Sequence, residues 1–361
     1  MSIERRELDR RDFIAVSSAT ALAGSALAMP LRSTASTGLA QSPSGSPASR
    51  ETVSVLKTPK DSYQIRVKGA TIDFNLVPMN SQIAEDCGEK VAYSSVRPDA
   101  VVLASPISCL VGIVGLALDG SPRVPRIVWD NREHQFWEGF EGTYEPRNVV
   151  VNAPRVEVTA DKSAVEVSYY YIANFVKTTI TSRFADPPFA EYKCMWDTTI
   201  TVENLTGKVL KNYLQFFACY HQAGTNYYWD SSNEIKPCPG GGFNASPDAE
   251  TIQMVQASPY TVHSNRYKRD HQIVFFQYKK PLLISQRQPW FGGLQHVMLV
   301  DPRTCATVTT WEQQARDHTV RPPKGDFQVG ESFTSRVRHV ITAADTVSDL
   351  EKIWGHFEQS L

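Results

Sequence analysis

The sequence lacks the short motifs that mark several large enzyme classes. It contains no G-x-x-x-x-G-K-[ST] or G-x-G-x-x-G phosphate-binding run, no H-E-x-x-H and no G-x-S-x-G. Because these motifs build phosphate cradles, zinc sites and nucleophile elbows, their absence argues against P-loop and dinucleotide-binding enzymes, H-E-x-x-H metalloproteases and α/β-hydrolases. The glycine run at 240–242 follows Cys238 and Pro239 and opens no predicted helix.

An excess of charge of one sign is also missing. The chain carries 37 Lys and Arg against 38 Asp and Glu, a formal net charge of −1. Its only basic cluster is the short RYKRDH at 266–271. A surface that binds a phosphate backbone needs a larger positive patch, so nucleic acid is not expected as a partner.

Closely spaced cysteines are absent as well. The six cysteines are far apart and form no CxxC, so a metal site built on thiolates is not predicted; they are Cys87, Cys109, Cys194, Cys219, Cys238 and Cys305. Six cysteines allow fifteen pairings, so disulfides and buried thiols both stay open. One pairing, Cys219 with Cys238, would staple the segment between them.

No run is long and apolar enough for a permanent membrane span, which needs roughly 20 predominantly apolar residues. The N-terminal segment instead has Arg10 and Arg11, then Asp12, Phe13 and Ile14, and a weakly apolar run to Ala28. This pattern resembles a twin-arginine (Tat) export signal. The resemblance implies passage through the Tat translocon and a periplasmic or secreted location in a bacterium.

The export signal is expected to cover residues 1–40, with cleavage near 28 or near 40. Residues 41–52, QSPSGSPASRET, are predicted to be a disordered linker because they contain no large apolar residue that could be buried. Residues 53–361 are predicted to fold as one domain, since β-rich domains often reach this size.

Strand patterns dominate the folded part. In VKTTITSRF (176–184), Val176, Thr178, Ile180, Ser182 and Phe184 alternate with polar residues, which is typical of an antiparallel strand with one wet face. Similar segments recur to residue 342, and NLTGK (204–208) is predicted to be a short hairpin loop. The sequence therefore predicts an all-β protein, a large antiparallel sandwich.

One helix is predicted, over residues 346–361. Ser348 with Glu351 has the spacing of a capping box. Six apolar residues fall on one helical stripe, which predicts packing against the sandwich; they are Val347, Leu350, Ile353, Trp354, Phe357 and Leu361.

Three segments resemble the galactose-mutarotase-like β-sandwich, or supersandwich, found in aldose epimerases, polysaccharide lyases and glycoside hydrolases. They are ITSRFADPPFAEYKCMWDTTITVENLTGKVLKNYLQFF, HVMLVDPRTCATVTTWE and FQVGESFTSRVRHVIT. The resemblance implies a supersandwich-like fold and, by analogy, a carbohydrate ligand. No segment matches the catalytic His and Glu motifs of the epimerases, so epimerase activity is not implied.

The strongest candidate for chemistry is CYHQAGTNYYWDSSNEIKPCPGGG (219–242), predicted to be a long loop leaving a central strand. His221, Asp230 and Glu234 are the predicted catalytic residues, as acid/base groups, and the two carboxylates could alternatively bind Ca²⁺. Tyr227, Tyr228 and Trp229 are predicted to stack on a sugar ring. The alternative is that these aromatic residues only pack the loop onto the sandwich.

Two further clusters are candidates for binding the sugar. WDNREHQFWEGFEGTYEPRN (129–148) contributes Arg132, His134 and Trp137, and TTWEQQARDHTVRP contributes Trp311 and His318, with Asp317-His318 predicted to lie in a loop. Aromatic rings stack on the apolar faces of sugars, while charged side chains bind their hydroxyls. The alternative for both clusters is a structural role.

Three hypotheses follow. The first is an exported carbohydrate-active enzyme, a lyase, isomerase or hydrolase that works by acid/base chemistry. The second is a non-catalytic periplasmic glycan-binding module, and the third is a structural envelope protein. The first two need the named aromatic residues at a surface, whereas the third would bury them.

Overall fold

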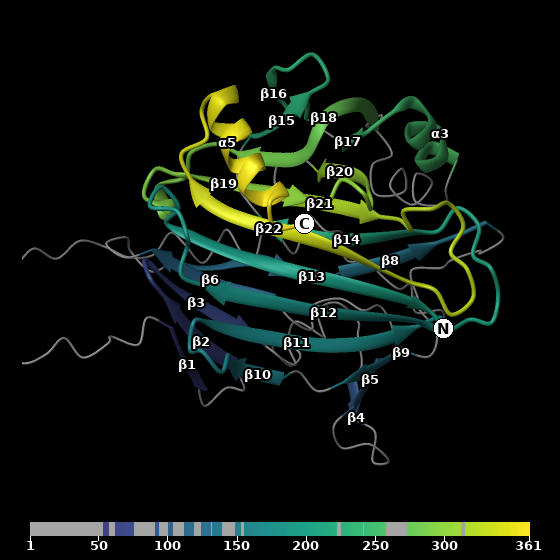
Figure 1. Cartoon of the computed structure of the whole chain (residues 1–361), viewed down its shortest axis with the longest axis horizontal. Coiled ribbons are helices and arrows are strands. Elements are labelled where there is room, and N and C mark those ends of the chain that lie inside the picture. Colours follow the sequence, from purple (N-terminus) through teal and green to yellow (C-terminus); the bar gives the residue numbers. More distant parts are fainter. Residues whose placement is uncertain are drawn as a thin grey trace, which may run out of the picture. The chain divides into compact units, whose positions relative to one another are not determined.

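The structure of the chain is a computed structural model, shown in Figure 1. It describes residues 53–57, 62–75, 91–93, 100–103, 112–118, 124–130, 132–138, 149–152, 155–221, 225–240, 242–257, 273–311 and 315–361. These residues belong to one compact unit, 51–361. The predicted export signal and the linker lie outside the described residues.

Among the described residues, twenty-two strands and two α-helices confirm the predicted all-β class with a C-terminal helix. A five-stranded sheet consists of β1 (Ser54–Lys57), β2 (Ser62–Val67), β3 (Ala70–Asn75), β6 (Gly112–Leu118) and β7 (Val124–Asp130). The other seventeen strands are linked in one array, which forms two layers.

The major layer contains the long strands β11, β12, β13 and β22, which run side by side (Figure 1). Its members are β4 (Val91–Tyr93), β5 (Ala100–Leu103), β9 (Val149–Asn152), β10 (Arg155–Val158), β11 (Ala164–Ala173), β12 (Val176–Ala185), β13 (Cys194–Asn204), β15 (Asn226–Asp230), β16 (Ile235–Pro237), β19 (Gln295–Val300) and β22 (Ser332–Thr342). The minor layer contains β8 (Arg132–Phe136), β14 (Leu214–His221), β17 (Gly242–Ser246), β20 (Cys305–Trp311) and β21 (Ala315–Val320).

Strand β18 (Val274–Ser285) joins the two layers. Its first half runs parallel to β17, with Phe275 opposite Asn244. Its second half pairs antiparallel with β19, with Leu283 opposite Met298. A 3₁₀ turn, η1 (Pro289–Phe291), follows it.

The alternation predicted for residues 176–184 is confirmed. The five residues expected on one face of β12 are all buried, whereas those between them are half-buried or exposed. The core they enter is shared by both layers and by the five-stranded sheet, and it includes Ile65, Trp196 and Phe217. Apolar burial from three groups of strands therefore stabilises a single body.

The loop predictions need two corrections. NLTGK does not close a hairpin, because β13 pairs with β12 and β22 in the major layer while β14 pairs with β8 and β21 in the minor layer. The segment after His221 is not one long loop but forms β15, β16 and the start of β17. Short-range turn signals do not reveal which partner a strand will find.

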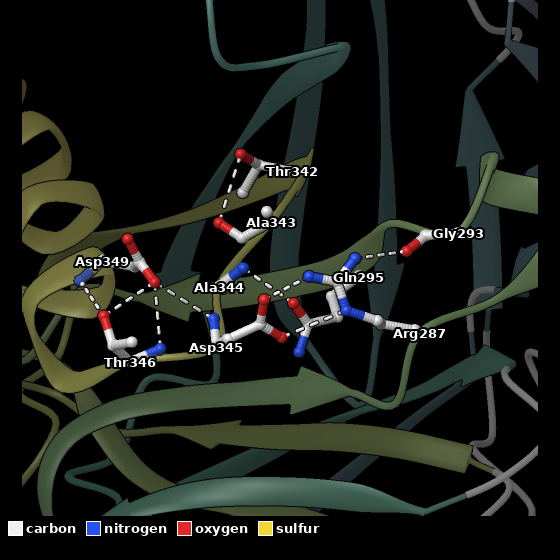
Figure 2. Close-up of polar contacts among 9 residues, drawn as sticks. All are labelled: Arg287, Gly293, Gln295, Thr342, Ala343, Ala344, Asp345, Thr346 and Asp349. Atoms are coloured by element: carbon white, nitrogen blue, oxygen red, sulfur yellow. Dashed lines mark hydrogen bonds and ion pairs between the residues drawn. The ribbon is translucent and has the colours of Figure 1, made fainter.

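Helix α5 (Val347–Glu358) buries Leu350, Ile353, Trp354 and Phe357, which confirms the predicted stripe. The cap differs from the predicted one. Thr346 Oγ1 accepts from the backbone N–H of Asp349 at 3.1 Å, and the Asp349 carboxylate accepts from Thr346 N at 2.9 Å (Figure 2). The helix begins one residue before Ser348, so Ser348 cannot be its cap.

The connection into α5 is fixed to the major layer by polar contacts (Figure 2). Gln295 Oε1 accepts from Ala344 N at 2.7 Å, and Arg287 pairs with Asp345. Further along, Arg338 on β22 binds Asp197 with two hydrogen bonds of 2.7 and 2.8 Å and donates to His356 O at 3.0 Å. These contacts hold α5 against the outer face of the major layer.

A second helix, α3 (Ala249–Ala257), was not predicted. Asp248 caps it, because Asp248 Oδ1 accepts from Thr251 N at 2.7 Å. Val255 packs with Leu214 and Phe216 on the outer face of the minor layer. The helix is nine residues long, too short for its periodicity to stand out in the sequence.

Candidate functional site

A row of polar residues crosses the outer face of the minor layer. Asp317 on β21 lies opposite Thr309 on β20, and Thr309 lies opposite Asn244 on β17. Opposed residues share a face of the sheet. All three are buried, and Thr309 Oγ1 donates to Asn244 Oδ1 at 2.5 Å, which fixes the orientation of the amide.

Two predicted site residues occupy neighbouring positions of this face. His221 lies opposite Ala315, and Ala315 lies opposite Trp311. Because Ala315 is two residues from Asp317 on β21, its row shares the face of Asp317. Diagonal neighbours in a sheet are about 7–8 Å apart, so one ligand can span both rows.

Strand β8 adds two more predicted residues to the same face. His134 lies opposite Phe216, which lies opposite Thr319, two residues from Asp317. Arg132 is two residues from His134, opposite Ala218. The structure describes Arg132, His134, His221 and Trp311 by their backbone register. We call these four positions, with Asp317, Thr309 and Asn244, the polar face.

The polar face combines the groups that acid/base chemistry and sugar binding use. Asp317 supplies a carboxylate, Asn244 an amide and Thr309 a hydroxyl, and the four register positions are occupied by His221, His134, Arg132 and Trp311. An apolar cluster of Phe136, Leu214, Phe216, Val255 and Ala306 adjoins it. Apolar surroundings strengthen hydrogen bonds and charge interactions made beside them.

The inner face of the same strands carries a second polar cluster, which links the two layers. Arg316 Nη1 donates to His296 O at 3.0 Å, and Arg316 Nη2 donates to His296 Nδ1. His296 Nε2 is 2.9 Å from His339 Nδ1. Since arginine can only donate, His296 carries its proton on Nε2 and donates it to His339. We call this chain of contacts the buried relay.

Burial keeps these imidazoles neutral. It lowers the pKa of His296 and of His339 well below the ordinary value, and the charge of Arg316 lowers both further. The ring of Trp196 stacks on His339, with centroids 4.7 Å apart. The relay is therefore a polar support inside the core rather than a set of titrating groups at a surface.

His318 was predicted to contact the substrate, and the structure corrects this. It lies on a strand, β21, and not in a loop. It alternates with Asp317, so it enters the core and stacks on Phe217 with centroids 5.2 Å apart. Burial lowers its pKa to about 3. Its neighbour Asp317 faces the other way, onto the polar face.

The predicted carboxylates Asp230 and Glu234 belong to the β15–β16 hairpin of the major layer. Lys236 Nζ lies 2.6 Å from Asp230 and 3.3 Å from Glu234. Although burial would raise the pKa of Asp230, hydrogen bonds from Lys236, from Glu234 N and from Ser232 lower it. A carboxylate held in this way is a weak base, and it stabilises the turn.

Tyr228 and Trp229 are buried in the core, which corrects the prediction of an exposed platform. Trp229 packs in the cluster beneath α5, its Nε1 donates to Asn233 Oδ1 at 2.9 Å, and Lys279 lies over its ring. Tyr227 is half-buried against the same cluster. These three aromatic residues therefore pack their segment onto the sandwich, as the alternative to sugar stacking predicted.

Trp137 follows β8 and is half-buried. Its ring stacks on Tyr213 with centroids 6.1 Å apart, and it packs against the core shared by the layers. These contacts fix the end of β8 to the core, so Trp137 fits the structural role that was the alternative to sugar binding.

Three of the six cysteines have described side chains, and all three are buried. Cys194, Cys238 and Cys305 are buried thiols, so the predicted staple between Cys219 and Cys238 is not formed. Burial raises the pKa of Cys194 and of Cys305 to about 12. Thiols with such pKa values are poor nucleophiles.

Metal ligands do not gather in the part of the chain that the structure describes, where no three His, Cys, Asp or Glu side chains come together. At Asp230 and Glu234, the alternative Ca²⁺ site, the ammonium group of Lys236 already supplies the positive charge. No helix among the described residues is long and apolar enough to cross a membrane.

Comparisons with known proteins find distant structural likeness alone. No protein-family model matches the sequence, and no curated protein is significantly similar to it. The galactosidase domain of an alpha-galactosidase-sucrose kinase matches with a TM-score of 0.40 at 11% identity, over 82% of this chain and 43% of that one. The chain thus spans less than half the length of that protein.

Two other solved structures are similar to the same extent. A GH36 alpha-galactosidase from Geobacillus stearothermophilus matches with a TM-score of 0.37 at 11% identity, over 78% of this chain and 40% of that one. A putative aldose 1-epimerase from Klebsiella pneumoniae matches with a TM-score of 0.36 at 9% identity, over 85% and 95% of the two chains. Likeness at this level assigns no residue a role.

Sequence reasoning missed Asp317, Thr309 and Asn244. Their signal is the alternation in ARDHTV and CATVTTW, where every second residue enters the core. The charged residues in ARDHTV argue against a buried strand, because arginine and aspartate are almost never fully buried unless paired. Only the strand pairing brings Asp317 beside Thr309 and Asn244 on one face of the sheet.

Proposed function

We propose that the protein is an exported carbohydrate-active enzyme, a lyase, isomerase or hydrolase, with its site on the polar face. The observation that carries the proposal is the register of the minor layer. It brings His221, Trp311, Arg132 and His134 to the same face as Asp317, Thr309 and Asn244.

In this proposal, His221 and Asp317 do the acid/base work. An imidazole is a common general acid/base group in enzymes, so His221 would take and return the proton. Asp317 would accept a hydrogen bond from a substrate hydroxyl or hold the imidazole in one orientation. Asn244, oriented by Thr309, would bind a second hydroxyl, and the indole of Trp311 would stack on the ring.

The test is a panel of neutral and acidic oligosaccharides incubated with the full chain and with Asp317→Asn, His221→Ala and Asp230→Asn. We expect His221→Ala and Asp317→Asn to lower turnover about a hundredfold or more, the loss typical of a removed acid/base group. Asp230→Asn is the control, because it removes a buried carboxylate of the turn outside the polar face. Unfolding midpoints show whether each variant is folded.

Full turnover by a folded Asp317→Asn variant would contradict the proposed site. Saturable binding without turnover, weakened by Trp311→Ala, would instead favour the glycan-binding module. Neither binding nor turnover across the panel would leave the structural envelope protein as the better hypothesis.

A further inference from the structure

A row of hydroxyl groups lies beside Asp317 and Asn244 on the outer face of the minor layer. Ser246 is two residues from Asn244 on β17, and Thr319 is two residues from Asp317 on β21, so both belong to the same face. Thr307 lies opposite Thr319 on β20, the strand between β17 and β21. We call Ser246, Thr307 and Thr319 the hydroxyl row.

The two ends of the hydroxyl row are buried without a hydrogen bond. All three side chains of the row are buried. Thr307 Oγ1 is 3.3 Å from Thr309 Oγ1, but neither Ser246 Oγ nor Thr319 Oγ1 has a hydrogen-bond partner among the described residues. A buried hydroxyl without a partner destabilises a fold, and native proteins seldom contain one. Such a group indicates a ligand or an ordered water that supplies the bond.

Helix α3 covers the hydroxyl row. It packs against β17 and β18, and its Val255 belongs to one apolar cluster with Phe216 on β14 and Ala306 on β20. Phe216 lies opposite Thr319, and Ala306 directly precedes Thr307. The helix therefore crosses the strands that carry the row.

The attachment of α3 to the sheet is weak. Of its nine residues, only Thr251 and Val255 are buried. Lids and ligand-binding loops are drawn from elements with few buried apolar contacts, because such elements open at a low cost in free energy. The unbonded hydroxyls of Ser246 and Thr319 destabilise the closed arrangement further. Opening of α3 would give a ligand a route to the row.

The chemistry of the hydroxyl row matches a sugar. A hydroxyl group both donates and accepts, so it can bind either the hydrogen or the oxygen of a sugar hydroxyl. Neighbouring strands are about 4.8 Å apart, so the row presents hydroxyls at a regular spacing. Asn244, oriented by Thr309, extends the same pattern with an amide.

The charges around the row favour an uncharged sugar over an acidic one. Asp317 places a carboxylate beside the row. Arg321 is two residues beyond Thr319, but its charge acts on Asp248 at the start of α3: the hydrogen bond from the backbone N–H of Thr251 and the charge of Arg321 both lower the pKa of Asp248. A uronate carboxylate would therefore meet one unmatched negative charge and no unmatched positive one among these neighbours.

We propose that the hydroxyl row, covered by α3, is a subsite for an uncharged sugar unit of the substrate. The inference rests on the proposed function, because it places this unit beside Asp317. In the bound state, sugar hydroxyls supply the bonds that Ser246 and Thr319 lack, and α3 closes over the sugar. The substrate class is then a neutral rather than an acidic oligosaccharide.

The test measures sugar binding by the full chain. Isothermal titration with neutral trisaccharides of glucose, mannose and galactose gives their affinities, and trigalacturonate is the acidic counterpart. We expect a neutral trisaccharide to bind and trigalacturonate to bind more weakly. Ser246→Ala and Thr319→Val should each weaken the neutral sugar about fivefold, which is equivalent to one neutral hydrogen bond.

Unfolding midpoints distinguish a ligand site from a structural one. Removal of the Ser246 or Thr319 hydroxyl removes no bond from the free protein, so the midpoint should stay unchanged or rise. Thr198→Val is the matched control, because Thr198 Oγ1 is 3.1 Å from Ser182 Oγ on the inner face of the major layer. It should lower the midpoint and leave sugar binding unchanged. Lower midpoints with unchanged binding at Ser246→Ala and Thr319→Val would assign both hydroxyls to ordered water and overturn the proposal.

Hydrogen exchange measures the movement of α3. In the free protein, the backbone amides of α3 should exchange faster than those of β17, and a bound neutral trisaccharide should slow them. Exchange in α3 that a bound sugar leaves unchanged would contradict its closure over the row.

Failure of the subsite and failure of the proposed enzyme give different results. Binding of a neutral trisaccharide that Thr319→Val weakens, without turnover, would support the subsite and contradict the enzyme. Turnover of trigalacturonate that Asp317→Asn abolishes and Thr319→Val leaves unchanged would support the enzyme and overturn the subsite. A wild type that binds none of the neutral trisaccharides would overturn the subsite as well.

Discussion

At the scale of single residues, alternation along β21 decides which side chains can do chemistry. Arg316 and His318 enter the core between the layers, where the buried relay connects β21 to β19 and β22. Asp317, between them, belongs to the polar face. One step along the strand thus separates a structural role from a proposed catalytic one.

The buried histidines should make stability depend on pH. His318 has a pKa of about 3 when folded, below its value in the unfolded chain, about 6.5. The unfolded chain therefore binds more protons between these values, and His318 destabilises the fold progressively as pH falls from about 6.5. This loss should approach about 1.4 kcal/mol per pH unit for each such histidine.

His318→Phe tests this prediction, since a phenylalanine can keep the stacking on Phe217. Urea unfolding from pH 7 to pH 4 should show a shallower loss of stability for the variant than for the wild type. The exposed Lys162→Gln variant, which changes no histidine, should follow the wild type. Parallel pH profiles for wild type and His318→Phe would contradict the assignment.

At the scale of elements, helix α5 shows how a single residue sets a boundary. The sequence pattern favoured Ser348 as the cap, but Thr346 and Asp349 make the reciprocal bonds. The apolar stripe was predicted correctly because it depends on the period of the helix and not on its first residue. A boundary depends on local geometry that periodicity does not contain.

We predict that Thr346→Ala destabilises the protein by about 1 kcal/mol, the usual effect of removing an N-cap. Ser348→Ala, which leaves that cap intact, should change the free energy of unfolding by less than about 0.5 kcal/mol. The unfolding midpoints of the two variants in denaturant show whether Thr346 or Ser348 caps the helix. A larger effect at Ser348 than at Thr346 would contradict the observed one.

At the scale of the whole molecule, one core joins the two layers and the five-stranded sheet. Ile65, Trp196 and Phe217 come from the three groups of strands and share it. Loss of any group would expose apolar surface on the others. The described unit should therefore unfold as one cooperative body rather than sheet by sheet.

Tryptophan fluorescence and far-ultraviolet circular dichroism measure this directly. Fluorescence reports on the packing around the chain's seven tryptophans, Trp196 in the core among them, whereas circular dichroism reports on all strands. The two transitions in denaturant should coincide, and Ile65→Ala should shift both by the same amount. An early transition seen by one probe alone, or a shift in one probe, would show that the five-stranded sheet unfolds separately.

The sequence by itself determined the all-β class, the faces of β12 and the buried stripe of α5. Each follows from the period at which apolar residues recur, which a single chain segment displays. The sequence also pointed to His221, Arg132, His134 and Trp311, because those residue types near strand ends are typical of sites.

Only the tertiary structure decided which of these positions share a face and which neighbours join them. Asp317 and Asn244 are 73 positions apart and meet through Thr309, in strands that pair because of the whole sheet order. Trp229 and Asp230 were predicted to belong to a site, but Trp229 is buried in the core and Asp230 stabilises a turn. Strand pairing depends on contacts between distant segments, and no local pattern contains them.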